Sequence, residues 1–222
     1  MRQLTLGSLA VAVTLAAGPL HGQTIVETYT GWDGTSGWHP FGLFTNGATD
    51  AYGQSFQAPA QYLNNWTLWM RGDRGSDASG LLFTANVGTW DGNSVGSILW
   101  TSALFAGTSS ATYQQYTFNT GGVSLLTGGQ TYIFFLDAVS GPGQMEVAGG
   151  NAGEYAAGSF NYHNGTDHFS AWDGGGLQDL AFRAEFDRLP GDPGSTVPEP
   201  ATMTLLATGL AGIAAGRRRK KQ

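Results

Sequence analysis

Short alternating apolar runs separated by glycine-rich turns restrict the fold of this chain more than any other feature. Near the end of the body, Leu180, Phe182, Ala184 and Phe186 occupy every second position, which is the period of a strand with one buried face. The run 131–139 has apolar residues on both faces, as expected of a central strand covered on both sides. Since the body shows no sustained 3.6-residue period with helix caps, the pattern predicts an all-β fold.

The other strand candidates are short and are bounded by turn signals. In one of them, Trp66 and Leu68 share a face opposite Trp69. About nine to eleven short strands at this spacing predict a single antiparallel β-sandwich, which we expect to be a jelly roll. The remaining candidates are residues 24–30, 51–58, 81–90, 96–105, 112–119 and 153–162.

Residues 1–23 have the layout of a secretory signal peptide. Arg2 lies in a short basic start, the uncharged apolar stretch 4–17 follows, and Gly18 and Pro19 end it. The apolar stretch is too short for a stable membrane span. We therefore expect an exported protein that is cleaved after Gly18 or a few residues later.

A second apolar segment and a basic cluster end the chain. Residues 201–216 are sixteen positions without a charge, and the basic tail 217–222 follows. As a helix, this segment spans roughly 24 Å, which is shorter than the hydrocarbon core of a bilayer, about 30 Å thick. Basic side chains that snorkel to the interface, together with local thinning of the bilayer, can make up the difference. We predict a transmembrane segment whose tail stays in the cytoplasm. The basic anchor residues are Arg217, Arg218, Arg219, Lys220 and Lys221.

A Pro-Glu-Pro sequence closes the linker 191–200 that precedes this segment. It consists of Val197, Pro198, Glu199 and Pro200, and the prolines hold the glutamate in extended backbone. Together with the apolar segment and the basic cluster, it resembles the PEP-CTERM sorting signal of exopolysaccharide-producing Gram-negative bacteria. The resemblance covers about the last 26 residues. It implies that exosortase, a membrane-embedded cysteine protease, processes an inner-membrane precursor near this motif and that the product reaches the cell surface or extracellular matrix.

The predicted domain, residues 24–190, also resembles β-sandwich modules found upstream of this sorting signal. The matching pieces are 53–59, 125–136 and 179–186. Such modules mostly have no assigned activity, so this resemblance implies a fold and a surface location and no chemistry.

The charge of residues 24–190 restricts the partners. Fourteen acidic residues against four arginines and no lysine leave a formal charge of −10. Such a surface repels nucleic acid and anionic lipid, and it suits a neutral polymer or divalent cations. The chain has no cysteine, which excludes disulfides, zinc-thiolate sites and cysteine nucleophiles.

The tripeptide Trp-Asp-Gly occurs three times and permits two interpretations. Asp-Gly is a strong turn dipeptide, so each copy can be a strand end that runs into a turn. The copy at Asp91-Gly92 predicts a hairpin, whereas the surplus glycine after Trp172 predicts a mobile loop edge. In the alternative interpretation, tryptophans on loops stack on sugar rings. The candidate carbohydrate-binding residues are Trp32, Trp38, Trp90 and Trp172.

Structural calcium is a further alternative, and we expect no other cofactor. Hard oxygen ligands lie on turn-rich loops, although their spacing is not that of an EF-hand. The candidate ligands are Asp73, Asp77, Asn164 and Asp167.

Catalysis is the least supported alternative. Glu146 and Glu154 are candidates for the paired carboxylates of a glycoside hydrolase, but no recognisable motif surrounds them. His163 and His168 are five positions apart, not four apart on a helix as in a zincin. We therefore expect a sorted, non-enzymatic protein with a structural or adhesive role alongside exopolysaccharide. A carbohydrate-binding module is the main alternative.

Overall fold

The structure of the chain is a computed structural model, and residues 22–195 form one compact unit within it. The predicted transmembrane segment, the linker, the basic tail and the signal peptide up to residue 22 lie outside the described residues. Within the described part, no helix is long and apolar enough to cross a membrane. The described residues are 23–59, 61–73, 78–124, 127–150, 155–165 and 167–188.

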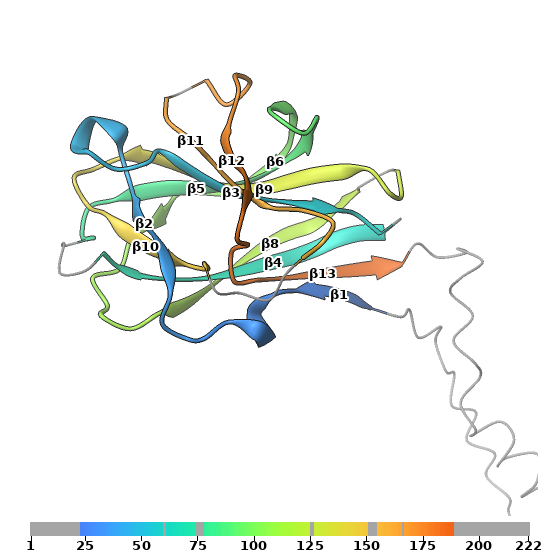
Figure 1. Ribbon diagram of the computed structural model, residues 1–222, viewed down its shortest axis with the longest axis horizontal. Coiled ribbons are helices and arrows are strands. Elements are labelled where there is room, and N and C mark those ends of the chain that lie inside the picture. The colour runs from blue at the N-terminus through green and yellow to red at the C-terminus, as the bar shows by residue number, and fades with distance from the viewer. Residues whose placement is uncertain are drawn as a thin grey trace, which may run out of the picture. The chain divides into compact units, whose positions relative to one another are not determined.

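The described residues form two antiparallel β-sheets, so the predicted all-β fold is confirmed (Figure 1). Two 3₁₀ turns, η1 (Tyr29–Gly31) and η2 (Phe44–Asn46), accompany them. The first sheet contains β1 (Thr24–Glu27), β13 (Phe182–Arg188), β4 (Gln61–Gly72), β8 (Gln114–Ser124), β10 (Met145–Ala148) and β2 (Gly37–Phe41). The second contains β12 (Asp173–Leu177), β11 (Phe160–His163), β3 (Ala51–Gln57), β9 (Thr131–Ser140), β5 (Leu82–Trp90), β6 (Val95–Thr101) and β7 (Phe105–Ala106).

One long strand organises the first sheet. β4 pairs with β8 along one edge, and β13 and β10 follow one another along its other edge. The side chains of Trp66, Leu68 and Met70 are fully buried between the sheets. Trp69 lies on the opposite face and is half-buried. The alternation predicted for this segment is therefore confirmed.

β9 is the central strand of the second sheet, between β3 and β5. Tyr132 and Phe134 point into the core between the sheets. Ile133 and Phe135 belong to a second buried cluster on the outer face of this sheet, together with Trp172. An apolar strand needs a cover on both faces, and this second cluster supplies the outer one.

Two chain segments cover the outer face of the second sheet. The backbone N–H of Trp172 donates to the carbonyl of Asn93 at 2.8 Å, and that of Val95 donates to the carbonyl of His168 at 3.4 Å. These bonds join the β5–β6 hairpin to the segment before β12. Trp172 lies in the loop before β12, but the exposed position expected for it there is wrong: the side chain is 5% exposed, because the apolar rings of the outer cluster surround it.

Several strand predictions also need correction. Of the predicted strand 153–162, the described residues show strand only in β11, and the predicted strand 112–119 runs instead from Gln114 to Ser124. The predicted strand 96–105 is two strands, β6 and β7, and the sequence pattern did not indicate β2, β10 or β12. The glycine-rich β12 is nevertheless a strand, because its backbone pairs with that of β11.

Candidate functional site

Two of the three Trp-Asp-Gly copies continue to a serine and form the same turn. In each, the aspartate Oδ1 accepts the backbone N–H groups of the second and third residues after it, and the serine hydroxyl donates to Oδ2. The distances are 2.8, 2.8 and 2.6 Å at Asp33 and 2.8, 2.6 and 3.0 Å at Asp91. The glycine has a positive φ at Gly34 and at Gly92, which favours glycine over other residues. The third copy has Gly176 in the serine position and does not share this turn.

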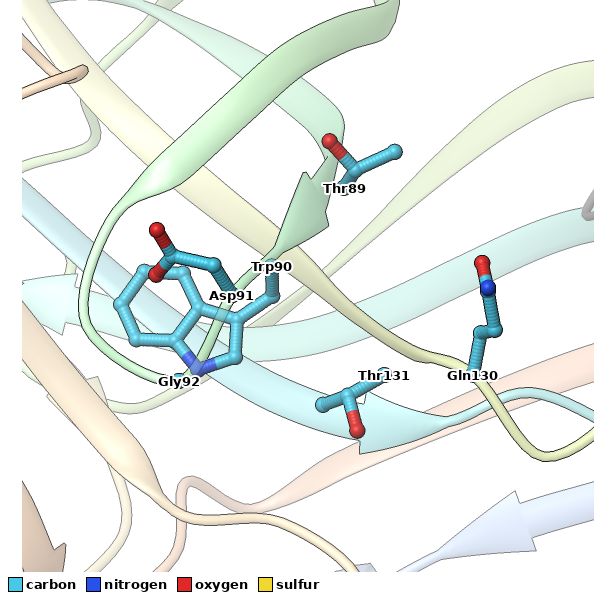
Figure 2. Close-up of a pocket in the computed structure, with 6 residues that line it drawn as sticks. All are labelled: Thr89, Trp90, Asp91, Gly92, Gln130 and Thr131. Carbon is cyan, nitrogen blue, oxygen red and sulfur yellow. The ribbon is translucent and has the colours of Figure 1, made fainter.

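The second of these turns borders a hollow of about 330 Å³ (Figure 2). The end of β5 and the turn after it supply four of the lining residues, and the segment that enters β9 supplies the other two. Figure 2 shows the indole of Trp90 beside the Asp91 carboxylate, with Gln130 and Thr131 to one side of them. The hollow is lined by Thr89, Trp90, Asp91, Gly92, Gln130 and Thr131.

The ring that faces this hollow rests on the buried outer cluster. The half-buried Trp90 meets Trp172 edge-on, with 5.8 Å between ring centroids. Trp172 in turn packs against Phe135 at 5.3 Å and His163 at 5.6 Å, and its Nε1 donates to the carbonyl of His168 at 2.9 Å. The fold therefore presents Trp90 as a supported, partly exposed aromatic surface.

The polar groups of the hollow retain hydrogen-bonding capacity. Backbone N–H donation from Asn93 and then Ser94 holds the pKa of Asp91 below its usual value, so the carboxylate is ionised at neutral pH. A carboxylate has about four acceptor positions, and three of those at Asp91 are occupied. Within the described residues, the side chains of Gln130 and Thr131 make no hydrogen bond. Together with the indole face, these groups can hold a neutral polyhydroxylated ring.

The other two predicted tryptophans lie elsewhere. Trp32 packs edge-on against Tyr113 at 4.7 Å, over the first sheet. Its Nε1 donates to the carbonyl of Ser36 at 2.8 Å. Trp38, on β2, stacks on Phe160 of the second sheet at 4.7 Å. Of the four candidates, the structure brings together only Trp90 and Trp172.

The glycosidase candidate Glu146 is held in an ion pair. Arg71 donates to its Oε2 from Nε at 3.1 Å and from Nη2 at 2.9 Å, and the Tyr113 hydroxyl donates to Oε1 at 2.8 Å. Burial, followed by this hydrogen bond, raises the pKa of Tyr113. Glu146 is 1% exposed, and its hydrogen bonds to Arg71 and Tyr113 explain how this charged side chain is accommodated there. Its proposed partner Glu154 lies outside the described residues.

The calcium ligands remain predictions. Asp73 is buried beside His39, and Asp77 lies outside the described residues. Asp167 Oδ1 accepts the backbone N–H of Phe169 at 3.2 Å within a turn, and Asn164 is exposed. Within the described ranges, no group of three histidine, aspartate or glutamate side chains is placed to hold a metal ion.

Comparison with known proteins identifies the chain end. Residues 196–220 match the family model described as the PEP-CTERM protein-sorting motif, so this predicted signal is confirmed. The motif implies an exported, membrane-anchored bacterial precursor that exosortase processes. No curated protein matches the chain.

Two solved structures show a weak likeness to the body. One is the carbohydrate-binding module TmCBM61 in complex with beta-1,4-galactotriose, at a TM-score of 0.30 and 11% identity over 56% of this chain and 77% of that chain. The other is infectious bursal disease virus Gx strain, at a TM-score of 0.30 and 14% identity over 93% of this chain and 52% of that chain. At these identities and TM-scores, neither similarity supports a conclusion about a ligand of this chain.

Proposed function

We propose that this protein is an exported surface or matrix protein whose β-sandwich has a structural or adhesive role alongside exopolysaccharide. The sorting motif at residues 196–220 is the observation that carries the proposal. It follows the sandwich, whose last described strand ends at Arg188, so processing near the Pro-Glu-Pro sequence would release an intact sandwich. The acidic body, with its formal charge of −10, suits a neutral polymer better than an anionic one.

Substitution of the motif tests this proposal. Changing Pro198, Glu199 and Pro200 together to alanine should leave a longer, membrane-retained form in a host that has exosortase. The matched control changes Pro190, Asp192 and Pro193, which lie upstream of the matched motif, to alanine and should leave processing intact. A triple-alanine variant with the size and location of the wild-type protein would show that the motif does not direct processing.

The Trp90 hollow supports a second candidate function, the binding of a neutral carbohydrate. Its supported indole face, the ionised Asp91 carboxylate and the side chains of Gln130 and Thr131 provide both a stacking surface and hydrogen-bonding groups. The ionised carboxylate and the negative body disfavour acidic sugars.

A glycan array probed with the purified protein tests this second candidate. Trp90→Ala should abolish binding to neutral glycans. Trp32→Ala is the matched control, since Trp32 precedes the same type of turn on the other sheet. If Trp32→Ala abolishes binding and Trp90→Ala leaves it intact, the hollow is not the binding site.

The strand order supports the jelly-roll form of the sandwich. Consecutive strands alternate between the sheets over much of the chain: β2 and β4 lie in the first sheet, and β3 and β5 lie in the second, so the chain crosses repeatedly between the two layers. We propose no catalytic role, and the engagement of Glu146 by Arg71 and Tyr113 supports this.

A further inference from the structure

A second pocket, of about 280 Å³, lies where β2 of the first sheet meets β3 and β11 of the second. It differs from the Trp90 hollow in being lined mainly by aromatic rings. Its lining residues are Trp38, His39, Thr49, Tyr52, Phe160 and Tyr162.

The rings of this pocket form a continuous group. Trp38 stacks on Phe160 at 4.7 Å, and Tyr162 stacks on the same ring at 6.3 Å. Tyr52 meets Phe160 edge-on at 5.2 Å. Phe160 and Tyr52 are buried, whereas Trp38 and Tyr162 are half-buried at the opening. A ligand that enters the pocket therefore meets aromatic surface from both sheets.

The pocket lining offers few polar side-chain groups. The Tyr52 hydroxyl is engaged within the fold, where it donates to the carbonyl of Pro40 at 3.4 Å. Trp38 Nε1 is buried and has no hydrogen-bond partner in the described part of the chain, so it is a donor available to a ligand, but no carboxylate or amide side chain lines the pocket to accept hydrogen bonds from a sugar. Aromatic surface therefore outweighs hydrogen-bonding capacity in this pocket.

Negative charge is instead concentrated beside the pocket. Asp73 is 8% exposed, and its Oδ1 lies 3.5 Å from Nδ1 of His39. That contact is within ion-pair range but is not a hydrogen bond, and Oδ1 accepts no hydrogen bond from the described residues. The charge of Asp73 reaches the pocket lining: burial raises the pKa of Tyr52 most strongly, and Asp73 raises it further.

We propose that this pocket binds a small organic monocation of the alkylammonium or quaternary ammonium class. Aromatic faces attract such cations through the negative charge of their π-systems, and desolvation in a pocket strengthens that attraction. The Asp73 carboxylate, which contacts the lining residue His39, adds an opposite charge beside the pocket. Trp38 and Tyr162 provide the ring surface that a ligand reaches first.

Titration of the purified full-length chain with tetramethylammonium and with choline, by calorimetry, tests this proposal. Both cations should bind saturably, and 3,3-dimethylbutan-1-ol, a neutral analogue of choline, should bind at least about tenfold more weakly because it lacks the cation–π attraction. Equal binding of the neutral analogue, or no saturable binding of either cation, would overturn the proposal.

Two variants and one control locate the site. Asp73→Asn is nearly isosteric and should weaken cation binding at least about tenfold, as should Tyr162→Leu, which removes a half-buried ring. Asp91→Asn removes the same charge at the other hollow and should leave cation binding unchanged. Near-ultraviolet circular dichroism checks that each variant is folded, and Tyr162→Leu decides if Asp73→Asn does not fold. Equal losses of cation affinity in Asp73→Asn and Asp91→Asn would show a general effect of the protein's charge and overturn the proposal. If the pocket instead bound neutral sugars, and Tyr162→Leu abolished that binding, the pocket would be a sugar site.

Discussion

Replacing Trp172 with alanine should lower the free energy of unfolding by about 3 kcal/mol, the lower end of the range for a buried tryptophan. The side chain is 5% exposed and packs against Phe135 and His163. Its loss also leaves the carbonyl of His168 without the indole donor at 2.9 Å, which accounts for about 1 kcal/mol of the total. The outer cluster lies near solvent, so water can enter the vacated space. Trp66→Ala in the main core should therefore cost more, about 5 kcal/mol.

Urea unfolding of the purified protein measures this difference. With a slope of about 2 kcal/mol per molar urea, the midpoint of Trp172→Ala should fall by about 1.5 M. Trp172→Phe is the control: it keeps a ring against Phe135 and loses the N–H donor, so it should cost only about 1 kcal/mol. A midpoint for Trp172→Ala within about 0.3 M of the wild-type value would refute the reasoning that Trp172 is a packing residue.

Three further predictions concern the turns and the buried ion pair. Gly92→Val should cost about 1–3 kcal/mol in the same urea assay, because φ is +102° there and valine strongly disfavours that conformation; an unchanged midpoint would contradict this. The pKa of Asp91 is lowered in the folded state, so its stabilising contribution is present above the ordinary aspartate pKa and is lost as the pH falls through the lowered value. The Asp91→Asn variant should therefore lose less stability on acidification than the wild-type protein. Identical pH profiles of the two proteins would contradict a stabilising role of this carboxylate in the turn. Glu146→Ala should lower the free energy of unfolding by about 2–4 kcal/mol because it leaves Arg71 without its carboxylate partner. A loss below about 0.5 kcal/mol would show that this ion pair does not stabilise the fold.

Strands with a clear period were predictable from sequence because their side chains obey a local rule. Leu180 to Phe186 and Trp66 to Met70 alternate, and both sets have their apolar face in the core. Met145–Ala148 is buried at all four positions and is too short for such a period. Strand β12 is rich in glycine, so its pairing with β11 depends on backbone contacts that a side-chain pattern does not show.

Part of the candidate site was predictable because it is formed by residues that are neighbours in the sequence. Trp90 and Asp91 belong to a local turn motif, and the serine three residues after the aspartate distinguishes the two turn-forming copies from the third. Gln130 and Thr131 join them only because β5 pairs with β9, and nothing in their own sequence context indicated a site. The burial of Trp172 was missed because its glycine-rich neighbours suggested an exposed loop edge, whereas Phe135, distant in the chain, covers its ring.

Mass spectrometry of both termini of the protein recovered from a host with exosortase tests the central claim most directly. The account predicts a mature chain that begins between residues 19 and 24 and ends close to Pro198-Glu199-Pro200, with the strands of the sandwich, from Thr24 to Arg188, intact. Recovery at the cell surface of a chain that still runs from Met1 to Gln222 would contradict it.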